Sequence, residues 1–134
     1  MRKKLKIGIV GLGYVGGAIR HWFEKKPEKY TLRFYDKFKS TGSLREINEA
    51  NIIFVAVPTP YTHKGYDDSA VQESLAGIEN GKTIVIKSTV VPGSTKKYQK
   101  KHQKKIILFN PEFLRSKTAE EDYLNPKIQI IGYA

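Results

Sequence analysis

The sequence contains no cysteine among its 134 residues. This absence excludes disulfide bonds, thiolate metal sites and a cysteine nucleophile within the chain. Acidic residues are also few, because 13 Asp and Glu stand against 24 Lys and Arg, and the formal net charge is +11. Such an excess favours anionic partners, among them nucleic acids, acidic lipids and diphosphate ligands, but does not select one of them.

Arginine and long hydrophobic runs are scarce as well. Only five of the basic residues are Arg, and the other 19 are Lys, which is the poorer bidentate reader of phosphate or guanine. No stretch approaches the roughly 20 apolar residues of a membrane span. The apolar run after the basic N-terminus is broken by Gly8, Gly11 and Gly13 and lacks a cleavage site for a signal peptide. The chain is therefore predicted to be soluble and cytoplasmic.

The length suits a single domain, since domains usually run to roughly 100–150 residues. Short apolar runs alternate with helical patterns, which indicates strands and helices alternating around a parallel sheet. The run Ile52–Val57 does not alternate between apolar and polar residues, as is typical of a central strand covered on both faces. We expect an α/β fold, a Rossmann-type doubly wound parallel sheet of about six strands, at residues 5–10, 30–35, 52–57, 83–86, 106–109 and 128–131.

Three helices are predicted between these strands. The first carries an apolar stripe over residues 15–23. The second begins at a cap formed by Asp68 or Ser69. The third spans residues 94–105 and has Tyr98 as its only large apolar group, so we expect an exposed helix whose lysine stems lie over the surface.

The segment Gly11–Gly16 reads Gly-Leu-Gly-Tyr-Val-Gly, a G-x-G-x-x-G motif between the first strand and the first helix. Gly11 permits a tight turn, Gly13 lets the backbone approach a pyrophosphate, and Gly16 allows the helix to pack closely on the strand. Free amides and the positive end of the helix dipole favour a diphosphate at this turn. Asp36 follows 20 residues after Gly16, at the end of the second strand, where a carboxylate accepts hydrogen bonds from an adenosine ribose.

These features predict that the chain binds NAD. The carboxylate of Asp36 would repel a 2′-phosphate and so favour NAD over NADP, whereas the neighbouring Lys37 acts in the opposite direction. An ordinary turn residue is the alternative interpretation of Asp36. The three histidines, His21, His63 and His102, have no spacing that indicates a metal site, and no metal is predicted.

Three further segments follow strands and would line one crevice with the glycine turn, because ligands of open α/β sheets bind at the carboxyl ends of the strands. They are residues 57–60 (Val-Pro-Thr-Pro), 87–95 (Lys-Ser-Thr-Val-Val-Pro-Gly-Ser-Thr) and 110–115 (Asn-Pro-Glu-Phe-Leu-Arg). Together with Asp67-x-Ser69-x-Val71 and the segment 126–132, their serial order resembles the N-terminal NAD-binding domain of the UDP-glucose/GDP-mannose 6-dehydrogenase family. The resemblance covers essentially the whole chain.

The resemblance implies roles for individual residues. In this family NAD oxidises C6 of a nucleotide sugar twice, first to the aldehyde and then, through an enzyme thioester, to the uronic acid. Thr89 matches the threonine that helps to position a water at the reacting carbon, and Glu112 matches the glutamate proposed as general base for thioester hydrolysis. When the family's roles are carried over position by position, the residues implied to contact the cofactor are Gly11, Gly13, Tyr14, Val15, Gly16, Asp36, Lys37, Val57, Pro58, Thr59, Ser88 and Thr89. Those implied to contact the sugar are Phe113, Leu114, Arg115 and Ser116.

The sequence departs from the family in three respects. The family's nucleophilic cysteine, with a lysine and an asparagine, lies on downstream segments, so residues 1–134 correspond to the NAD-binding Rossmann domain without the central helix and the C-terminal substrate domain. Ser116 stands where many members have a second glutamate, and the segment between Asp36 and Ile52 has room for barely one helix, at residues 43–48. Alone, the chain is expected to be a monomer and to supply at most half of an active site.

Three functions stay open. The first is the cofactor domain of a nucleotide-sugar 6-dehydrogenase, active only with a partner domain that supplies the cysteine. The second is a stand-alone, non-catalytic NAD-binding module, in which Thr89 is a turn residue and Glu112 a solvated charge. The third is nucleic-acid binding through the lysines of residues 96–105, although this stretch has one aromatic, Tyr98, and no Arg, and specific readers present Arg or stacking platforms. Another Rossmann hydroxyacid dehydrogenase would not explain residues 110–114.

Overall fold

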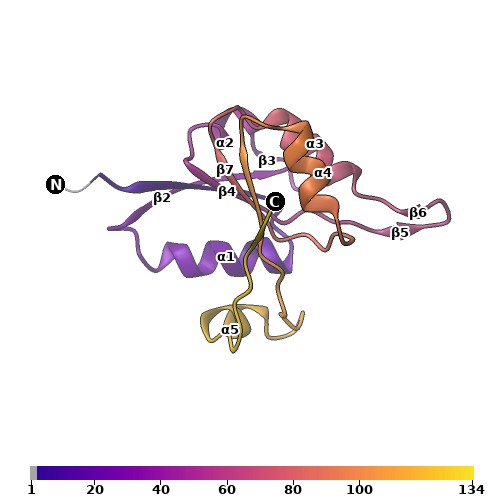
Figure 1. Cartoon of the computed structure of the whole chain (residues 1–134). Helices are drawn as coiled ribbons and strands as arrows, with labels where there is room; N and C mark the ends of the chain where they lie inside the picture. The colour runs from indigo at the N-terminus through magenta and orange to yellow at the C-terminus, as the bar shows by residue number, and fades with distance from the viewer. Residues whose placement is uncertain (1–2) are drawn as a thin grey trace.

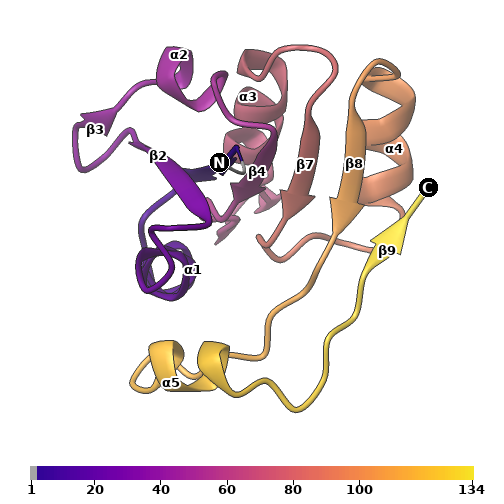
Figure 2. The same cartoon turned by 90° about the vertical axis from the view of Figure 1, so that its left-hand side faces the viewer.

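Strand β1 (Leu5–Val10) lies near the centre of a seven-stranded sheet in the computed structural model, which describes residues 3–134. The sheet order is β3-β2-β1-β4-β7-β8-β9 (Figure 2). Four strands run parallel to β1: β2 (Tyr30–Asp36), β4 (Ile52–Val55), β7 (Thr83–Ile86) and β8 (Ile106–Phe109). The two edge strands, β3 (Thr41–Gly42) and β9 (Gly132–Tyr133), are antiparallel to their neighbours. This is the strand order of a Rossmann sheet, as predicted, with its third strand shortened and reversed.

Five of the predicted strands are confirmed, and β4 ends two residues earlier than expected, at Val55. The strand predicted at residues 128–131 is wrong, because these residues, all within the described chain, form no strand, and pairing with β8 begins only at Gly132. Ile128 and Ile131 are 62% and 65% exposed. An apolar run predicts a strand only where a free sheet edge and a covering layer are available, and here the covering layer is missing.

Helices cover both faces of the sheet, as the doubly wound prediction requires (Figure 1). On one face lie α1 (Tyr14–Glu24) and, beside it, α5 (Ala119–Leu124), which the sequence patterns did not predict. The other face carries α2 (Leu44–Ile47), α3 (Ser69–Gly77) and α4 (Ser94–Lys101). The hairpin of β5 (Tyr61–Thr62) and β6 (Gly65–Tyr66) projects from the body of the molecule.

Two hydrophobic clusters, one on each face, hold the layers together. On the α3 and α4 face, Ile53 and Val55 of β4 are fully buried. On the α1 face, Ile52 and Phe54 of the same strand pack against a cluster around Ile19 and Phe23. The non-alternating pattern of β4 is thereby explained, because both of its faces meet apolar side chains. None of the described helices is long and apolar enough to cross a membrane.

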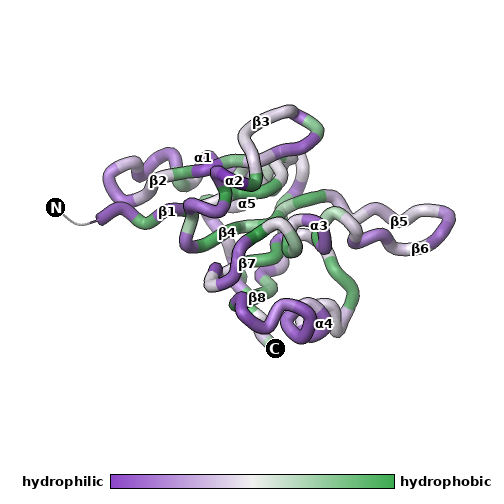
Figure 3. The backbone as a smooth tube through the Cα atoms, turned by 90° about the horizontal axis from the view of Figure 1, so that it is seen from above, coloured by the Kyte–Doolittle hydropathy of each residue, from purple (hydrophilic) through white to green (hydrophobic). Residues whose placement is uncertain are grey.

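Helix α4 differs from its prediction. It ends at Lys101 rather than at residue 105, and Tyr98 is only 1% exposed, with its hydroxyl donating to the carboxylate of Asp68. Lys105 is also buried and donates to the carbonyl of Leu75. The expectation of an exposed helix is therefore wrong for the face that carries Tyr98, since a single aromatic side chain suffices to anchor it. The remaining lysines form a hydrophilic outer face (Figure 3).

Two neighbouring isoleucines of β8 differ in burial, and replacing each of them tests which one packs in the core. Ile107 is 1% exposed and Ile106 is 58% exposed. We expect Ile107→Ala to lower the free energy of unfolding by about 2–5 kcal/mol, because it leaves a cavity, and Ile106→Ala to lower it by less than about 1 kcal/mol. Urea denaturation followed by circular dichroism measures both. Equal losses for the two variants would contradict the assigned burial.

Candidate functional site

The order of the strands in the sheet reverses between β1 and β4. In open α/β sheets a ligand-binding crevice forms at such a point, outside the carboxyl ends of the strands. Gly11, at the end of β1, has a φ of +89°, and a Cβ there would lie 2.4 Å from the carbonyl oxygen of Ala56. A Cβ on Gly16 would lie 1.8 Å from the carbonyl oxygen of Gly11. These two glycines therefore bring β1, the turn and α1 together as the motif predicts.

Gly13 is different, because a Cβ there would meet no atom within 4 Å. The residue is exposed and forms the N-cap of α1 with no side-chain cap hydrogen bond, and the first turn of α1 contains no acidic residue. The amide groups of Tyr14 and Val15 stand in this first turn. The N-terminus of α1 consequently offers backbone donors and the positive end of a helix dipole to open space, the arrangement that suits a phosphate group.

Asp36 lies beside this turn, at the end of β2, and is 8% exposed. Its Oδ2 accepts a hydrogen bond of 2.7 Å from the amide of Leu12, and its Oδ1 accepts from the amides of Phe38 and Lys39. Burial alone raises the pKa of Asp36, but these backbone hydrogen bonds and the positive charge of Lys39 outweigh it, so the pKa is lowered. The carboxylate is therefore charged and fixed in orientation.

Lys39 was missed at the sequence level. Its ammonium Nζ donates to the carbonyl oxygen of Leu12 at 2.5 Å, so it lies against the glycine turn. The predicted Lys37 instead pairs with Glu73 of α3, at 3.1 Å. Both residues are lysines of the turn that follows β2, and the conformation of this turn decides which lysine faces the site.

A cavity of about 250 Å³ opens on the other side of Gly11. Gly11, Lys37, Val57 and Pro58 line it together with α3 residues. The structure thus brings together four of the residues assigned to the cofactor, from the segments that follow β1, β2 and β4. Its lining is mostly apolar, with Lys37 and Glu73 as its charged residues, an arrangement suited to a flat heterocyclic base.

The loops after β4 and β7 are joined by their side chains. Thr59 Oγ1 donates to the carbonyl oxygen of Thr89 at 2.7 Å, and the hydroxyl of Tyr66 donates to the same oxygen at 2.9 Å. Ser88 is buried and donates to the carbonyl oxygen of Val57 at 2.7 Å. The hydroxyl proton of Ser88 is thus used within the protein. Tyr66 was not predicted, because nothing in its sequence context signals that the β5–β6 hairpin folds back to residue 89.

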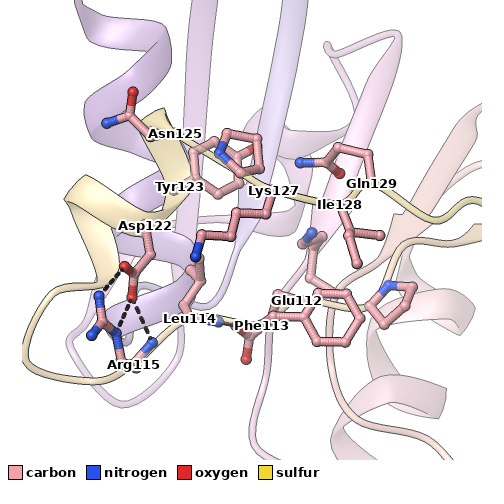
Figure 4. A pocket seen from close by; sticks show the side chains of 13 residues that line it. Glu112, Phe113, Leu114, Arg115, Asp122, Tyr123, Asn125, Lys127, Ile128 and Gln129 are labelled. Carbon is pink, nitrogen blue, oxygen red and sulfur yellow. Dashed lines mark hydrogen bonds and ion pairs between the residues drawn. The ribbon is translucent and has the colours of Figure 1, made fainter.

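The largest of the more enclosed cavities, about 420 Å³, lies after β8 (Figure 4). The predicted Glu112, Phe113, Leu114 and Arg115 form one wall of it. Glu112 accepts a hydrogen bond from the amide of Leu114. The side chain of Arg115 is 76% exposed and is paired with an aspartate of α5, Asp122, at 2.7 Å. Arg115 is therefore already neutralised within the wall.

Ser116 lies away from the rest of the strip assigned to the sugar. It borders a wider hollow of about 770 Å³ between α1 and α5, together with Gly13, Tyr14 and Lys39. The strip of residues 113–116 therefore divides between two hollows. The residue at which the sequence departs from the family pattern is also the one that faces the glycine turn.

Two buried polar residues, Lys87, which lines the 420 Å³ cavity, and Asn110, which is hydrogen-bonded to it, were given no role from the sequence. Lys87 is 4% exposed, and its Nζ donates to Asn110 Oδ1 at 2.8 Å. Asn110 Nδ2 in turn donates to the carbonyl oxygen of Ile130 at 2.7 Å. Burial lowers the pKa of Lys87 to about 8, and attraction to Glu112 opposes this shift. The signal in the sequence that could have pointed to Lys87 is a lysine directly after an apolar strand.

Comparison with known proteins places this arrangement in a family. The family model described as UDP-glucose/GDP-mannose dehydrogenase family, NAD binding domain, matches residues 20–134. The chain belongs to this family. It is 30% identical to UDP-glucose 6-dehydrogenase of Campylobacter jejuni over 163 aligned residues, which cover 96% of the chain and 42% of the relative. It is 32% identical to the putative UDP-glucose 6-dehydrogenase YtcA of Bacillus subtilis, covering 96% of the chain and 39% of that protein.

Solved structures of similar fold include other dehydrogenases. A UDP-D-ManNAc dehydrogenase from Pyrococcus horikoshii superposes with a TM-score of 0.82 at 19% identity, over 96% of the chain and 41% of that structure. A UDP-glucose dehydrogenase from Pyrobaculum islandicum gives 0.79 at 23% identity, over 97% and 41%. The predicted resemblance, the Rossmann fold and the assignment as an NAD-binding domain are confirmed. The chain spans about two fifths of the length of these relatives.

The carboxylate of Asp36 makes a testable contribution to stability. Its pKa is lowered on folding, so the stabilisation it provides is present above its ordinary pKa of 3.8 and is lost as the pH falls through the folded value. We expect Asp36→Asn to lower the free energy of unfolding at pH 7 by about 1–3 kcal/mol, and the difference from wild type to narrow below about pH 4. Urea titrations of both proteins at pH 7 and at pH 3 measure this difference.

The exposed Glu28, replaced by Gln, controls for the change in net charge. It is expected to shift the unfolding midpoint little at pH 7, since surface substitutions usually change stability by about 0.5 kcal/mol or less. A gap between Asp36→Asn and wild type that stays constant from pH 7 to pH 3 would contradict the role given to the carboxylate.

Proposed function

We propose that residues 1–134 form one NAD-binding domain that supplies the cofactor half of a nucleotide-sugar 6-dehydrogenase. The observation that carries this proposal is the uncapped start of α1 at Gly13, open to space and flanked by the charged Asp36. A side chain at Gly13 would extend into the open space at the start of α1. The residues present therefore fit a dinucleotide diphosphate.

The contacts of Asp36 support a role in binding the adenosine ribose. A carboxylate has about four lone-pair sites, and backbone amides use three of them: one on Oδ2, from Leu12, and two on Oδ1. Oδ2 keeps an acceptor site for a ribose hydroxyl. Because the amides already orient the group, binding a ribose requires little further ordering of the side chain.

On the substrate side, the proposal assigns proton transfer and positioning to the chain itself. Bound NAD would supply the hydride acceptor. Thr89, held by Thr59 and Tyr66 through its carbonyl, would position a water, and Glu112, fixed by the Leu114 amide, would take a proton from it. The strip at Phe113–Arg115 would contact the sugar.

The chain contains no cysteine, so a thioester step would need a nucleophile from elsewhere. We propose that the nucleotide-sugar site and this cysteine belong to a second domain, supplied in the same polypeptide or in a separate one. Relatives more than twice as long as the matched region support this division. A cytoplasmic location and a monomeric state for these residues alone are further predictions.

Calorimetric titration with NAD tests cofactor binding directly. We expect Gly13→Val to weaken NAD binding by more than about 100-fold, because its side chain fills the phosphate position, and Asp36→Ala to weaken it by about tenfold through loss of ribose hydrogen bonds. NADP should bind more weakly than NAD to the wild type and regain affinity relative to NAD in Asp36→Ala.

Gly17→Ala is the matched control. Gly17 also has nothing within 4 Å of a Cβ, but its amide already donates to the carbonyl oxygen of Gly13 at 2.8 Å. It is expected to bind NAD as the wild type does. Failure of the folded wild-type chain to bind NAD at millimolar concentration would overturn the proposed function.

A second measurement separates the enzymatic role from that of a non-catalytic NAD-binding module. The chain is mixed with a cysteine-containing C-terminal domain of a relative and UDP-glucose, and the absorbance of reduced nicotinamide is followed. Turnover that is lost in Asp36→Ala supports the enzymatic role. NAD binding without turnover, for any nucleotide sugar, favours the module.

The exposed lysines of α4 make nucleic acid the competing candidate partner. Binding of this kind would fall steeply with added salt and persist in Gly13→Val, since α4 lies on the opposite face of the sheet from α1. Fluorescence anisotropy with a labelled duplex distinguishes it. We expect no association at 150 mM salt tighter than about 10⁻⁴ M, the weak end of non-specific binding.

A further inference from the structure

Lys87 stands at the carboxyl end of β7, where the chain leaves the sheet toward Thr89. It is 4% exposed, and yet it lines the 420 Å³ cavity with Glu112 and Tyr123. Its Nζ lies 5.8 Å from the centre of the Tyr123 ring. A lysine amine is thus enclosed by the protein and faces a space large enough for a small ligand.

The hydrogen bonds of Lys87 leave part of the amine free. An ammonium group carries three donors, and among residues 3–134 one acceptor, Asn110 Oδ1, is within hydrogen-bond distance of it. Asn110 is itself fixed by Ile130 and Gln129. The single strong contact orients Nζ without saturating it, and the neutral amine would keep its lone pair available.

Burial, and not the charge of the groups around this cavity, favours the neutral amine. Arg115 and Asp122 are paired with each other, at 2.7 Å, and Lys127 adds a further positive charge. Glu112 is the one lining carboxylate outside that pair, among the residues recorded around the cavity, and it attracts the ammonium form. Burial outweighs this attraction and holds the pKa of Lys87 at about 8, so roughly a tenth of the group is neutral at pH 7.

Lys105 provides an internal comparison. It is 6% exposed, nearly as buried as Lys87, and burial also lowers its pKa. However, its Nζ donates to the carbonyl oxygen of Leu75, and it lines none of the three cavities described above. Its amine is therefore a structural donor, whereas that of Lys87 faces open volume.

We propose that Lys87 is a nucleophilic amine that captures small aldehydes in this cavity. The Nζ lone pair forms a bond to the carbonyl carbon while the C=O π bond breaks, and the amine proton passes through Glu112 to the oxygen, giving a carbinolamine. The carbinolamine hydroxyl then takes up one proton from solvent through Glu112, the C–O bond breaks, water leaves, and a protonated imine is formed. No oxidant or reductant is consumed, and the one proton taken up from solvent leaves the imine nitrogen with a positive charge.

This proposal goes beyond the proposed function, because the amine chemistry needs no NAD. The choice of aldehyde as the ligand class rests on the proposed function in one respect only: loss of one hydride and one proton from a primary alcohol gives an aldehyde. An amine placed after β7, beside the loop of Thr89, would hold such a product. The chain has no thiol that could do so.

Reductive trapping tests the proposal on the full chain. The protein is treated briefly with glycolaldehyde and cyanoborohydride at pH 7, and the modified lysines are quantified by peptide mapping and mass spectrometry. We expect Lys87 to be labelled at least about tenfold faster than Lys105 and the exposed Lys100, and its labelling to level off above about pH 8. Glu112→Gln should slow the labelling of Lys87 severalfold and leave that of Lys105 unchanged.

The comparison between lysines of the wild-type chain requires no variant to fold. Labelling of Lys87 no faster than that of Lys105 at pH 7, or a rate that keeps rising from pH 8 to pH 10, would overturn the proposal. NAD titration of the untreated protein is independent of this result, so a chain that binds NAD but does not trap aldehyde at Lys87 separates the two proposals.

Discussion

The hydrogen bond from the Leu12 amide to the Asp36 carboxylate joins the two halves of the proposed cofactor site. It ties the glycine turn after β1 to the end of β2, and the same carboxylate also receives two amides of the following turn. The turn can lie this close because Gly11 and Gly16 have no side chain where the backbone of β1, β4 and α1 meets. One buried charge therefore determines the shape of the turn as well as its ligand chemistry.

Much of this site could be predicted because it depends on local rules. Glycine spacing, strand length and the position of Asp36 each follow from short-range geometry, and the structure places them as expected. Tyr66, Lys39 and Lys87 could not be found in this way. Each acts through a contact with a loop distant in sequence, and a tyrosine or lysine with the same neighbours is more often solvated.

The wrong predictions have a common physical origin. Residues 128–131 are apolar enough for a strand, and Tyr98 lies in a stretch polar enough for an exposed helix, but burial is set by what packs against them. The Tyr98 hydroxyl finds Asp68 at the start of α3, whereas Ile128 and Ile131 meet no covering layer in the described chain. Local composition therefore predicts whether a segment is a helix or a strand better than it predicts whether that segment is buried.

The outermost strand β3 has a consequence for the behaviour of the molecule in concentrated solution. β3 and β9 are each two residues long and run against the direction of the five strands between them. A sheet that ended on a long parallel strand would present a row of unsatisfied peptide groups on which another chain could align. At the β3 edge, ending instead on a short reversed segment leaves little template for lateral pairing, which guards that edge of the sheet against fibrous self-association.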